Sequence, residues 1–183
     1  MGSINIDRTI YTSKPENADR LQKEMEAYEL LDRLGISYLR VDHDETATIE
    51  VCHEVEELLD IEICKNLFLC NSQKNSFYLL MMPGNKKFET KAISKQVSSS
   101  RLSFADAGNM EKYLNITPGS VSLLGLMYDK NHCVRLLIDK DLLCSEYLGC
   151  HPCVNTSSLK IRTADILEKF LPHTGHIPEF VEV

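Results

Sequence analysis

The chain has 183 residues, of which 43% are hydrophobic and 26% are charged. This composition and length are typical of one globular domain that buries its own core. The net charge of −7 argues against a protein that binds long nucleic acid over its whole surface. No apolar run approaches the roughly 18 residues of a membrane span, and residues 1–14 lack the pattern of a secretory signal. We therefore expect a cytoplasmic protein that does not enter a membrane.

The cysteines and the charges are unevenly distributed. Seven cysteines, an odd number, stand mostly inside apolar runs, which is typical of reduced core thiols and not of a disulfide framework. Nine acidic residues and no Lys or Arg lie between Asp42 and Glu62. A basic run follows, with Glu89 its only acid: Lys86, Lys87, Lys91, Lys95 and Arg101. Such a run is either a solvated face or a local patch for a short piece of phosphate backbone.

The first third of the chain predicts two helices and a strand. Ser13–Glu16 is a capping-box pattern with proline in the first turn, so we expect a helix to begin there. Apolar residues then recur at helical spacing from Leu21 to Leu34, and Gly35 is suited to end the helix. Ile36–Val41 alternates as a strand, and Thr48–Asp60 places one apolar face on a second helix.

The middle of the chain predicts a hairpin. Ile63–Cys70 is an apolar run that carries Lys65 near its head, and Phe77–Met82 is a second run that Pro83-Gly84 stops. The turn-forming residues between the two runs favour an antiparallel pair. Further on, Thr90 is suited to cap a basic helix over Lys91–Ser98.

The remaining elements complete an α/β pattern. We expect a helix at Asp106–Leu114, followed by a hairpin of two strands, Val121–Tyr128 and Cys133–Ile138. A loop at Gly149–Cys153 then leads into a strand at Val154–Ile161. A helix at Thr163–Leu171 and an extended tail at Ile177–Val183 end the predicted order. The chain is thus predicted to be a single α/β domain with a mixed, mostly antiparallel sheet and surrounding helices.

Two features suggest chemistry. A lysine on an otherwise apolar strand is either a strand-end side chain that extends to solvent or a functional amine, and both readings of Lys65 stay open on this evidence. Cys150-His151-Pro152-Cys153 suggests a dithiol redox centre, part of a metal site, or a structural or substrate-pocket loop. The segment leads into a predicted strand and not a helix, and a second metal-ligand pair is absent nearby, so the loop reading is favoured. No nucleophile elbow, Walker loop, Rossmann fingerprint or His-Glu-x-x-His motif is present.

Five ordered blocks together resemble one family. The blocks are Lys65–Leu69, Arg101–Ala105, Ile116–Val121, Val134–Leu142 and His151–Thr156. They are similar to the YbaK-type, prolyl-tRNA-synthetase-associated editing domains, and most similar to the free-standing deacylases that clear alanine mischarged on proline tRNA. The resemblance covers residues 25–183, the expected editing domain, and leaves residues 1–24 as an N-terminal extension, expected to be helical and packed on that domain.

The resemblance implies a trans-editing hydrolase that cuts the ester between a wrong amino acid and the terminal adenosine of a tRNA, without a metal or other cofactor. It implies that Lys65 is the catalytic residue. An ammonium there would stabilise the oxyanion that forms when water attacks the ester, or would bind the terminal phosphate or ribose. A free ribose hydroxyl is thought to help position the water in such enzymes, which agrees with the lack of an evident protein nucleophile.

The resemblance also implies a substrate pocket. Gly149, Cys150, His151 and Pro152 match a pocket loop that would admit alanine and bar the larger proline. Asn66, Arg101, Ser103 and Asn155 match further family positions, where they either bind substrate or brace loops. This chain departs from the frequent Phe-His-Pro-Leu pattern at residues 150–153, and Glu62-Ile63-Cys64 precedes Lys65 in place of a Gly-His-Thr-like lead-in.

The expected partner is the acceptor end of a charged tRNA, with Lys86, Lys87, Lys91 and Lys95 as its contacts, and prolyl-tRNA synthetase is a second partner that the resemblance raises. Two other functions stay open. One is a non-catalytic protein that binds or regulates aminoacyl-tRNA ends on the same fold. The other is a thiol-redox protein that uses Cys150 and Cys153.

Overall fold

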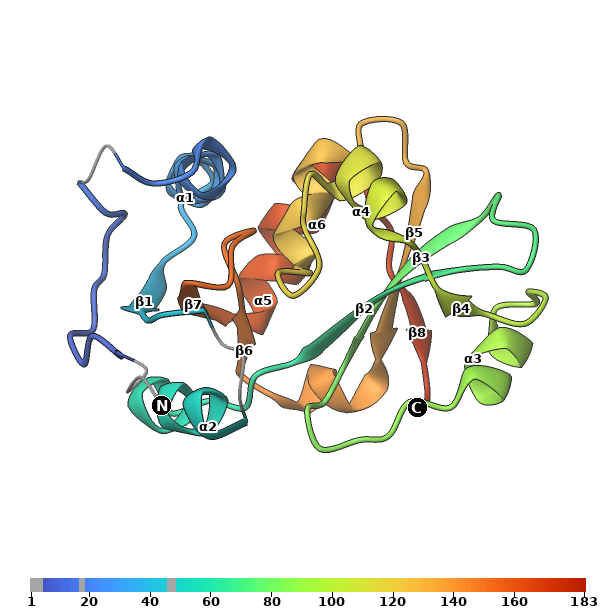
Figure 1. Ribbon diagram of the computed structural model, residues 1–183, viewed down its shortest axis with the longest axis horizontal. Helices are drawn as coiled ribbons and strands as arrows, with labels where there is room; N and C mark the ends of the chain where they lie inside the picture. The colour runs from blue at the N-terminus through green and yellow to red at the C-terminus, as the bar shows by residue number, and fades with distance from the viewer. Residues whose placement is uncertain (1–4, 17–18, 46–48) are drawn as a thin grey trace.

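The computed structural model describes residues 5–16, 19–45 and 49–183, and these form two β-sheets with helices around them (Figure 1). One sheet is antiparallel and has the order β1 (Tyr38–Asp42), β7 (Ser157–Arg162), β6 (Tyr147–Cys150). The other has the order β4 (Ser103–Phe104), β2 (Lys65–Cys70), β3 (Phe77–Met82), β5 (Val134–Asp139), β8 (Glu179–Val181). The predicted α/β class with mixed, mostly antiparallel pairing is confirmed, although the strands divide between two sheets.

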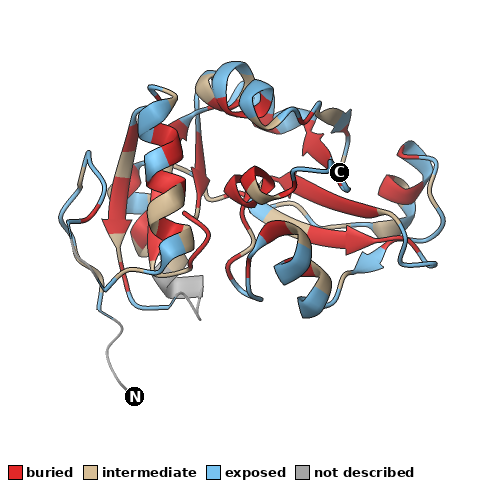
Figure 2. Cartoon of the chain, turned by 90° about the horizontal axis from the view of Figure 1, so that it is seen from above, coloured by how far each residue is buried: buried red, intermediate tan, exposed pale blue. Residues whose placement is uncertain are grey.

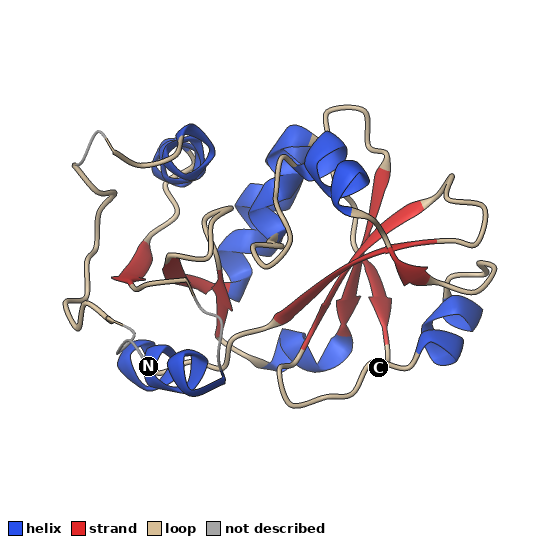
Figure 3. Cartoon of the chain, viewed as in Figure 1, coloured by secondary structure: helices blue, strands red, loops and turns tan. Residues whose placement is uncertain are grey.

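Helices flank both sheets, as Figure 3 shows. α1 (Gln22–Arg33) and α2 (Ile49–Leu59) lie beside the three-stranded sheet, and α3 (Thr90–Gln96) lies at the other end of the molecule near β4 (Figure 1). α4 (Ala107–Leu114) and the 3₁₀-helix η1 (Leu123–Tyr128) pack on each other. A second 3₁₀-helix, η2, spans Lys140–Cys144, and the last helical run is formed by α5 (Thr163–Asp165), η3 (Ile166–Phe170) and α6 (Leu171–Thr174).

One hydrophobic core joins the two sheets. Its buried side chains include Leu159 and Ile161 of the three-stranded sheet and Phe68 and Leu79 of the five-stranded sheet, together with Phe170 from the last helical run. In Figure 2 most strands and the inward faces of the helices are buried, whereas the short edge strand β4 and the outward helix faces are exposed. Because apolar area buried in common stabilises both sheets together, the described chain behaves as one domain.

The two sheets meet at a short seam. Ile63, just before β2, forms an isolated parallel bridge with Gly149 of β6. A Cβ atom on Gly149 would lie 2.6 Å from Cδ1 of Ile61 and 3.2 Å from Cα of Ile63. Glycine is therefore required here by close approach of the main chains. The seam places the head of β2 beside the end of β6.

The β2–β3 hairpin forms as predicted. The two strands pair antiparallel from Lys65 opposite Met82 to Cys70 opposite Phe77. The side chain of Asn71 organises the turn, because its Oδ1 accepts from the main-chain N–H groups of Asn75 and Ser76. Asn-mediated bonds of this kind stabilise tight turns.

The expected helix start at Ser13–Glu16 is wrong, because α1 begins at Gln22. Tyr11 instead exchanges main-chain hydrogen bonds with Arg40 at 2.9 and 2.8 Å, and Arg40 Nε donates to the carbonyl of Ser13 at 3.2 Å. Pairing with the edge of β1 therefore overrides the local capping pattern. The expected end of the helix is confirmed, since Gly35 has φ of 64°. The predicted cap Thr90 is one residue off, because Glu89 is the N-cap and Thr90 is the first residue of α3.

The expected hairpin of Val121–Tyr128 with Cys133–Ile138 is wrong. The first segment is η1, capped by Ser122 Oγ, which accepts from the N–H of Leu124. Gly125 packs so closely that a Cβ would lie 2.6 Å from Cδ1 of Ile116. β5 consequently pairs in parallel with β3 and β8. The predicted loop at Gly149–Cys153 is also shorter than expected, because β6 extends to Cys150.

Residues 5–16, 19–45 and 49–183 contain no helix that combines the length and the apolar character needed to cross a membrane.

Candidate functional site

A cavity of about 240 Å³ lies at the seam between the two sheets. Its walls come from the head of β2, the turn before η1 and the end of β6; the lining residues are Ile63, Cys64, Asn66, Gly119, Val121, Cys150 and His151. A larger hollow of about 680 Å³ lies between Gly35 and Arg162, but its described lining contains none of the residues that the sequence singled out. The smaller cavity gathers three of them, and it is the candidate site.

Asn66 lines the cavity and carries an unused buried acceptor. Its Nδ2 donates to the carbonyl of Cys64 at 3.3 Å, whereas its buried Oδ1 has no hydrogen-bond partner within the described chain. Leaving a buried polar atom unpaired costs about 1–3 kcal/mol. A ligand that donates an N–H or O–H to this oxygen would therefore gain more than an ordinary surface contact gives.

His151 brings a second acceptor. Its Nδ1 lies 2.9 Å from the main-chain carbonyl oxygen of Ser157. A carbonyl oxygen only accepts, so Nδ1 carries the proton and Nε2 carries the lone pair. Nε2 makes no hydrogen bond to any other described residue, and the half-buried ring lines the cavity. Burial lowers the pKa of His151, so the ring is neutral at pH 7 and Nε2 is free to accept.

A second neutral imidazole stands behind His151. The two rings of His43 and His151 meet edge-on with centroids 6.3 Å apart. His43 Nδ1 lies 2.8 Å from the carbonyl of Asp44, and Nε2 lies 2.9 Å from Ser158 Oγ. Burial lowers the pKa of His43 as well. Both nitrogens of His43 are therefore occupied, and only His151 offers a free one to the cavity.

Lys65 stands at the head of β2 with an exposed side chain. Its Nζ donates to the main-chain carbonyl of Lys86 at 2.8 Å, on the loop after β3. Successive side chains of a strand point to opposite faces, so Asn66 faces the cavity and Lys65 does not line it. The exposed side chain of Lys65 has to rotate before its ammonium meets a group bound there. The catalytic assignment of Lys65 stays a prediction.

The other three residues of the predicted pocket loop occupy different positions relative to the cavity. Cys150 lines the cavity, Pro152 is buried, and Gly149 makes the seam. Burial raises the pKa of the Cys150 thiol far above its ordinary value and that of Cys153 to about 12. Both thiols stay protonated at neutral pH, which weighs against the redox alternative.

Gly119 and Val121 line the cavity, and we did not single them out as site residues from the sequence. The sequence feature that could have indicated them is the Thr117-Pro118-Gly119 turn, which brings the main chain to the cavity wall. Gly119 has φ of 89°, a conformation that glycine adopts without strain. Asn155 lies across from it, since a Cβ on Gly119 would be 3.5 Å from Asn155 Nδ2. Asn155 itself lines a neighbouring hollow of about 320 Å³ and does not line the candidate cavity.

The structure does not bring Arg101 and Ser103 to the cavity. Both are exposed at the sheet edge formed by β4, where Ser103 pairs with Cys70 at the far end of β2. Cys70 is five residues along the strand from Lys65, a span of about 16 Å. Ser103 Oγ instead lies 3.8 Å from Cys70 Sγ.

The predicted tRNA-contact lysines are of two kinds. Lys86 Nζ forms ion pairs with Asp139 at 2.8 Å and Asp141 at 2.7 Å, so its charge is neutralised within the protein. Lys87, Lys91 and Lys95 are exposed, and none forms an ion pair with a described residue. These three lie on or beside α3, at the opposite end of the molecule from α1 (Figure 1).

Across the described ranges, no three His, Cys, Asp or Glu side chains converge in a way that could hold a metal ion.

Comparison with known sequences decides the family. The sequence profile of the aminoacyl-tRNA editing domain matches residues 43–169. The chain belongs to the aminoacyl-tRNA editing domain family. The matched stretch contains Lys65, Asn66, Gly119 and His151, so the whole wall of the candidate cavity lies within it.

Similar proteins agree with the family and the fold. The chain is 33% identical over 157 residues to the prolyl-tRNA editing protein ProX of Acetoanaerobium sticklandii, covering 84% of this chain and 93% of that protein. It is 29% identical over 160 residues to the prolyl-tRNA synthetase associated domain-containing protein 1 of Danio rerio, covering 86% and 85%. A crystal structure of "a putative trans-editing enzyme for prolyl tRNA synthetase" superposes with a TM-score of 0.65 at 15% identity, covering 90% of this chain and 99% of that one.

Proposed function

We propose that this editing-domain protein is a trans-acting deacylase that hydrolyses the ester of a mischarged tRNA, with alanine on proline tRNA as its substrate. The family and the name of the ProX relative support the reaction class. The observation that carries the proposal is the cavity itself, because its two free acceptors match the chemistry of an aminoacyl group.

The α-amino group of an esterified amino acid presents several N–H donors. Asn66 Oδ1 and His151 Nε2 are acceptors without a partner in the described chain, and each can take one of these donors. A cavity of about 240 Å³ accommodates a small aminoacyl group. Proline has one N–H fewer to offer the two acceptors, and its ring is larger than the methyl group of alanine. A second pocket that excludes the correct substrate supplies the discrimination that one methylene alone cannot.

Hydrolysis follows from water attack on the ester carbonyl carbon. The carbonyl oxygen becomes negative as the new C–O bond forms. The ammonium of Lys65, at the head of β2, would rotate away from the carbonyl of Lys86 and stabilise this charge. The bond to the ribose oxygen then breaks, and the proton from water ends on that oxygen. The products are a free amino acid and a tRNA with its terminal hydroxyl restored.

The test is a deacylation panel. Purified protein is mixed with proline tRNA carrying alanine, serine, cysteine or proline, and release of the labelled amino acid is followed. We expect release of alanine and retention of proline, in the presence and absence of EDTA. Equal rates for alanine and proline would refute the size selection, and loss of activity in EDTA would refute metal independence.

A second function is favoured by one observation, the position of Lys65 outside the cavity. If that side chain stays with Lys86 when substrate is bound, the protein is a binder or regulator of aminoacyl-tRNA ends. Tight binding of Ala-tRNA without any release of alanine would identify this case. Co-purification with prolyl-tRNA synthetase, with and without tRNA, tests the second proposed partner.

A further inference from the structure

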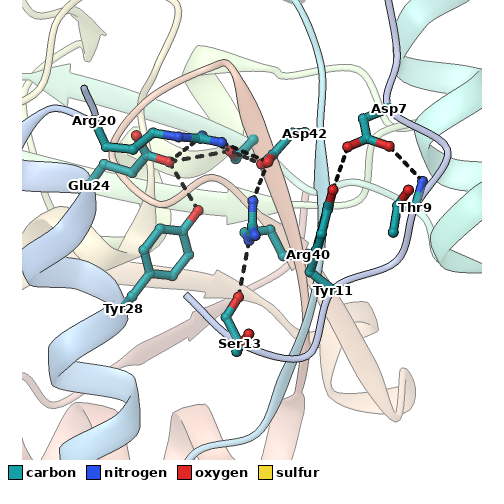
Figure 4. A network of polar contacts seen from close by, with 10 residues as sticks. Asp7, Thr9, Tyr11, Ser13, Arg20, Glu24, Tyr28, Arg40 and Asp42 are labelled. Carbon is teal, nitrogen blue, oxygen red and sulfur yellow. Dashed lines mark hydrogen bonds and ion pairs between the residues drawn. The ribbon is translucent and has the colours of Figure 1, made fainter. Parts of the chain in front are cut away.

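A buried ionic network lies behind the loop that carries His151. Asp42, the last residue of β1, accepts from Arg20 Nη2 at 2.7 Å, from Arg40 Nη1, and from Ser157 Oγ at 2.6 Å. Arg20 Nη1 also donates to Glu24 Oε1 at 2.9 Å. Figure 4 shows Arg20, Glu24, Arg40 and Asp42 directed toward one another.

The charges of this network are balanced and partly withdrawn from solvent, since Arg20 and Asp42 keep 22% and 18% of their side-chain exposure. Two guanidinium groups face two carboxylates, and Glu24 and Arg40 are 2% and 3% exposed. Burial opposes ionisation of Asp42, but hydrogen bonds from Arg40, Ser157 and Arg20 outweigh it and lower the pKa of this carboxyl. Charge-assisted bonds to a planar guanidinium are stronger and more directional than neutral ones. The network therefore fixes the position of Asp42.

Ser157 connects the network to His151. Its side chain donates to Asp42, and its main-chain carbonyl accepts from His151 Nδ1. Ser157 also stands opposite Asp42 in the pairing of β1 with β7. Ser157, which is fully buried, is thus bound to the ionic network through its hydroxyl group and to the imidazole of His151 through its main-chain carbonyl.

We propose that Arg20 and Asp42 are positioning residues of the editing site: acting through Ser157, they hold His151 in the one tautomer that presents an acceptor nitrogen to the cavity. This inference rests on the proposed function. Asp42 stands directly before the matched stretch 43–169, and Arg20 lies in the expected N-terminal extension. Without the network the Ser157 carbonyl loses its fixed position, and His151 divides between two tautomers.

The tautomer is measured directly. Long-range ¹H–¹⁵N spectra of histidine side chains distinguish a ring protonated at Nδ1 from one protonated at Nε2. We expect one Nδ1-protonated state for His151 in the native protein at pH 7.5 and a mixture in Ser157→Ala and Arg20→Gln. Arg135→Gln is the matched control, because Arg135 also pairs with a glutamate, Glu179, but on the remote strands β5 and β8.

Kinetics supply the second readout. The acceptor on His151 binds the amino group in both ground and transition states, so its loss raises KM and leaves kcat unchanged. We expect KM for the mischarged tRNA to rise about tenfold in Ser157→Ala and Arg20→Gln, with kcat within about twofold. Ser157→Thr retains the hydroxyl and is expected to restore both the single tautomer and the native KM. Arg135→Gln is expected to match the native protein.

The two proposals fail in different ways. Native protein that releases no amino acid from any mischarged tRNA would refute the deacylase function. Normal turnover together with an unchanged tautomer and KM in Ser157→Ala would refute only the positioning role. Ser157→Ala removes no charge, so it keeps the test decisive even if Arg20→Gln fails to fold.

Discussion

The ammonium of Lys65 donates to the main-chain carbonyl of Lys86 across 2.8 Å, at the place where the loop after β3 returns to the head of β2. This contact holds the amine outside the lining of the cavity. It is a single exposed hydrogen bond, so it stabilises the fold little. Lys65 is thus free to serve a ligand.

Lys65→Ala is expected to reduce deacylation by about 100-fold or more, because an ammonium near a developing oxyanion is a large part of the stabilisation of such a transition state. The melting temperature should change by less than about 2 °C, since the side chain is exposed. Lys130→Ala, which removes an exposed lysine from the turn before β5, is the control and should keep full activity. An active Lys65→Ala variant would remove Lys65 from the mechanism.

The pH dependence of activity should report His151. Burial holds its pKa below 6.5, and only the neutral ring can accept through Nε2. Affinity for the aminoacyl group should therefore be constant above pH 7 and fall as the pH drops through the pKa of His151. In His151→Asn this limb of the kcat/KM profile should vanish. Persistence of the same limb in the variant would assign it to another group.

Folding stability should fall in mildly acidic solution. His43 and His151 both have a lowered pKa in the folded state, so the unfolded chain binds more protons below pH 6.5. Their stabilising contribution is complete above pH 6.5 and is lost as the pH falls toward the folded pKa values. Each histidine contributes a slope of up to about 1.4 kcal/mol per pH unit in that window. Urea unfolding between pH 5 and 8 measures it, and a flat profile would contradict the burial of these rings.

Gly149→Ala should destabilise the protein by about 1–3 kcal/mol, because the new methyl group would overlap Ile61 and the main chain of Ile63. The control is Gly108→Ala in α4, where the nearest atom would lie at 3.4 Å and alanine should stabilise the helix by about 0.5–1 kcal/mol. Urea unfolding of the two variants should therefore give changes of opposite sign. Equal effects would mean that the seam is looser than the structure shows.

Lys91 and Lys95, the exposed lysines of α3, are expected to contact the acceptor stem of the tRNA. Replacing both by glutamine should raise KM and make the salt dependence of binding shallower, by about 0.9 in log–log slope for each lost phosphate contact. Lys86→Gln should leave the salt slope unchanged, since Lys86 is already paired with Asp139 and Asp141. Filter binding from 50 to 200 mM salt distinguishes the two, and an unchanged slope in the double variant would exclude α3 from the interface.

Local signals predicted the elements whose partners lie close in sequence. The β2–β3 hairpin follows from two apolar runs around a polar turn. α4 begins after Asp106, whose side chain accepts from the N–H of Asn109, and ends at the left-handed Asn115. Here pattern, cap and turn agree, and tertiary contacts reinforce them.

Signals that depend on distant contacts were misread or missed. Ser13–Glu16 has a capping pattern, but hydrogen bonds from Arg40 to Tyr11 and Ser13 hold the start of that segment against the edge of β1. Residues 123–128 contain no β-branched side chain, and an apolar run of that kind fits a helix as well as a strand. The Lys65 block and the His-Pro loop indicated the site, whereas the unpaired Asn66 oxygen and the Ser157 contact of His151 exist only in three dimensions.

The junction at Ile63 and Gly149 has a consequence for how selectivity can diverge among relatives of this protein. The candidate cavity lies over the junction between two separately hydrogen-bonded layers, so its width depends on the angle at which those layers meet. A substitution deep in either layer, far from the cavity lining, can widen or narrow the cavity by tilting one layer against the other. Under the proposed function, substrate range then depends on the packing of the whole domain as well as on the few side chains that line the cavity.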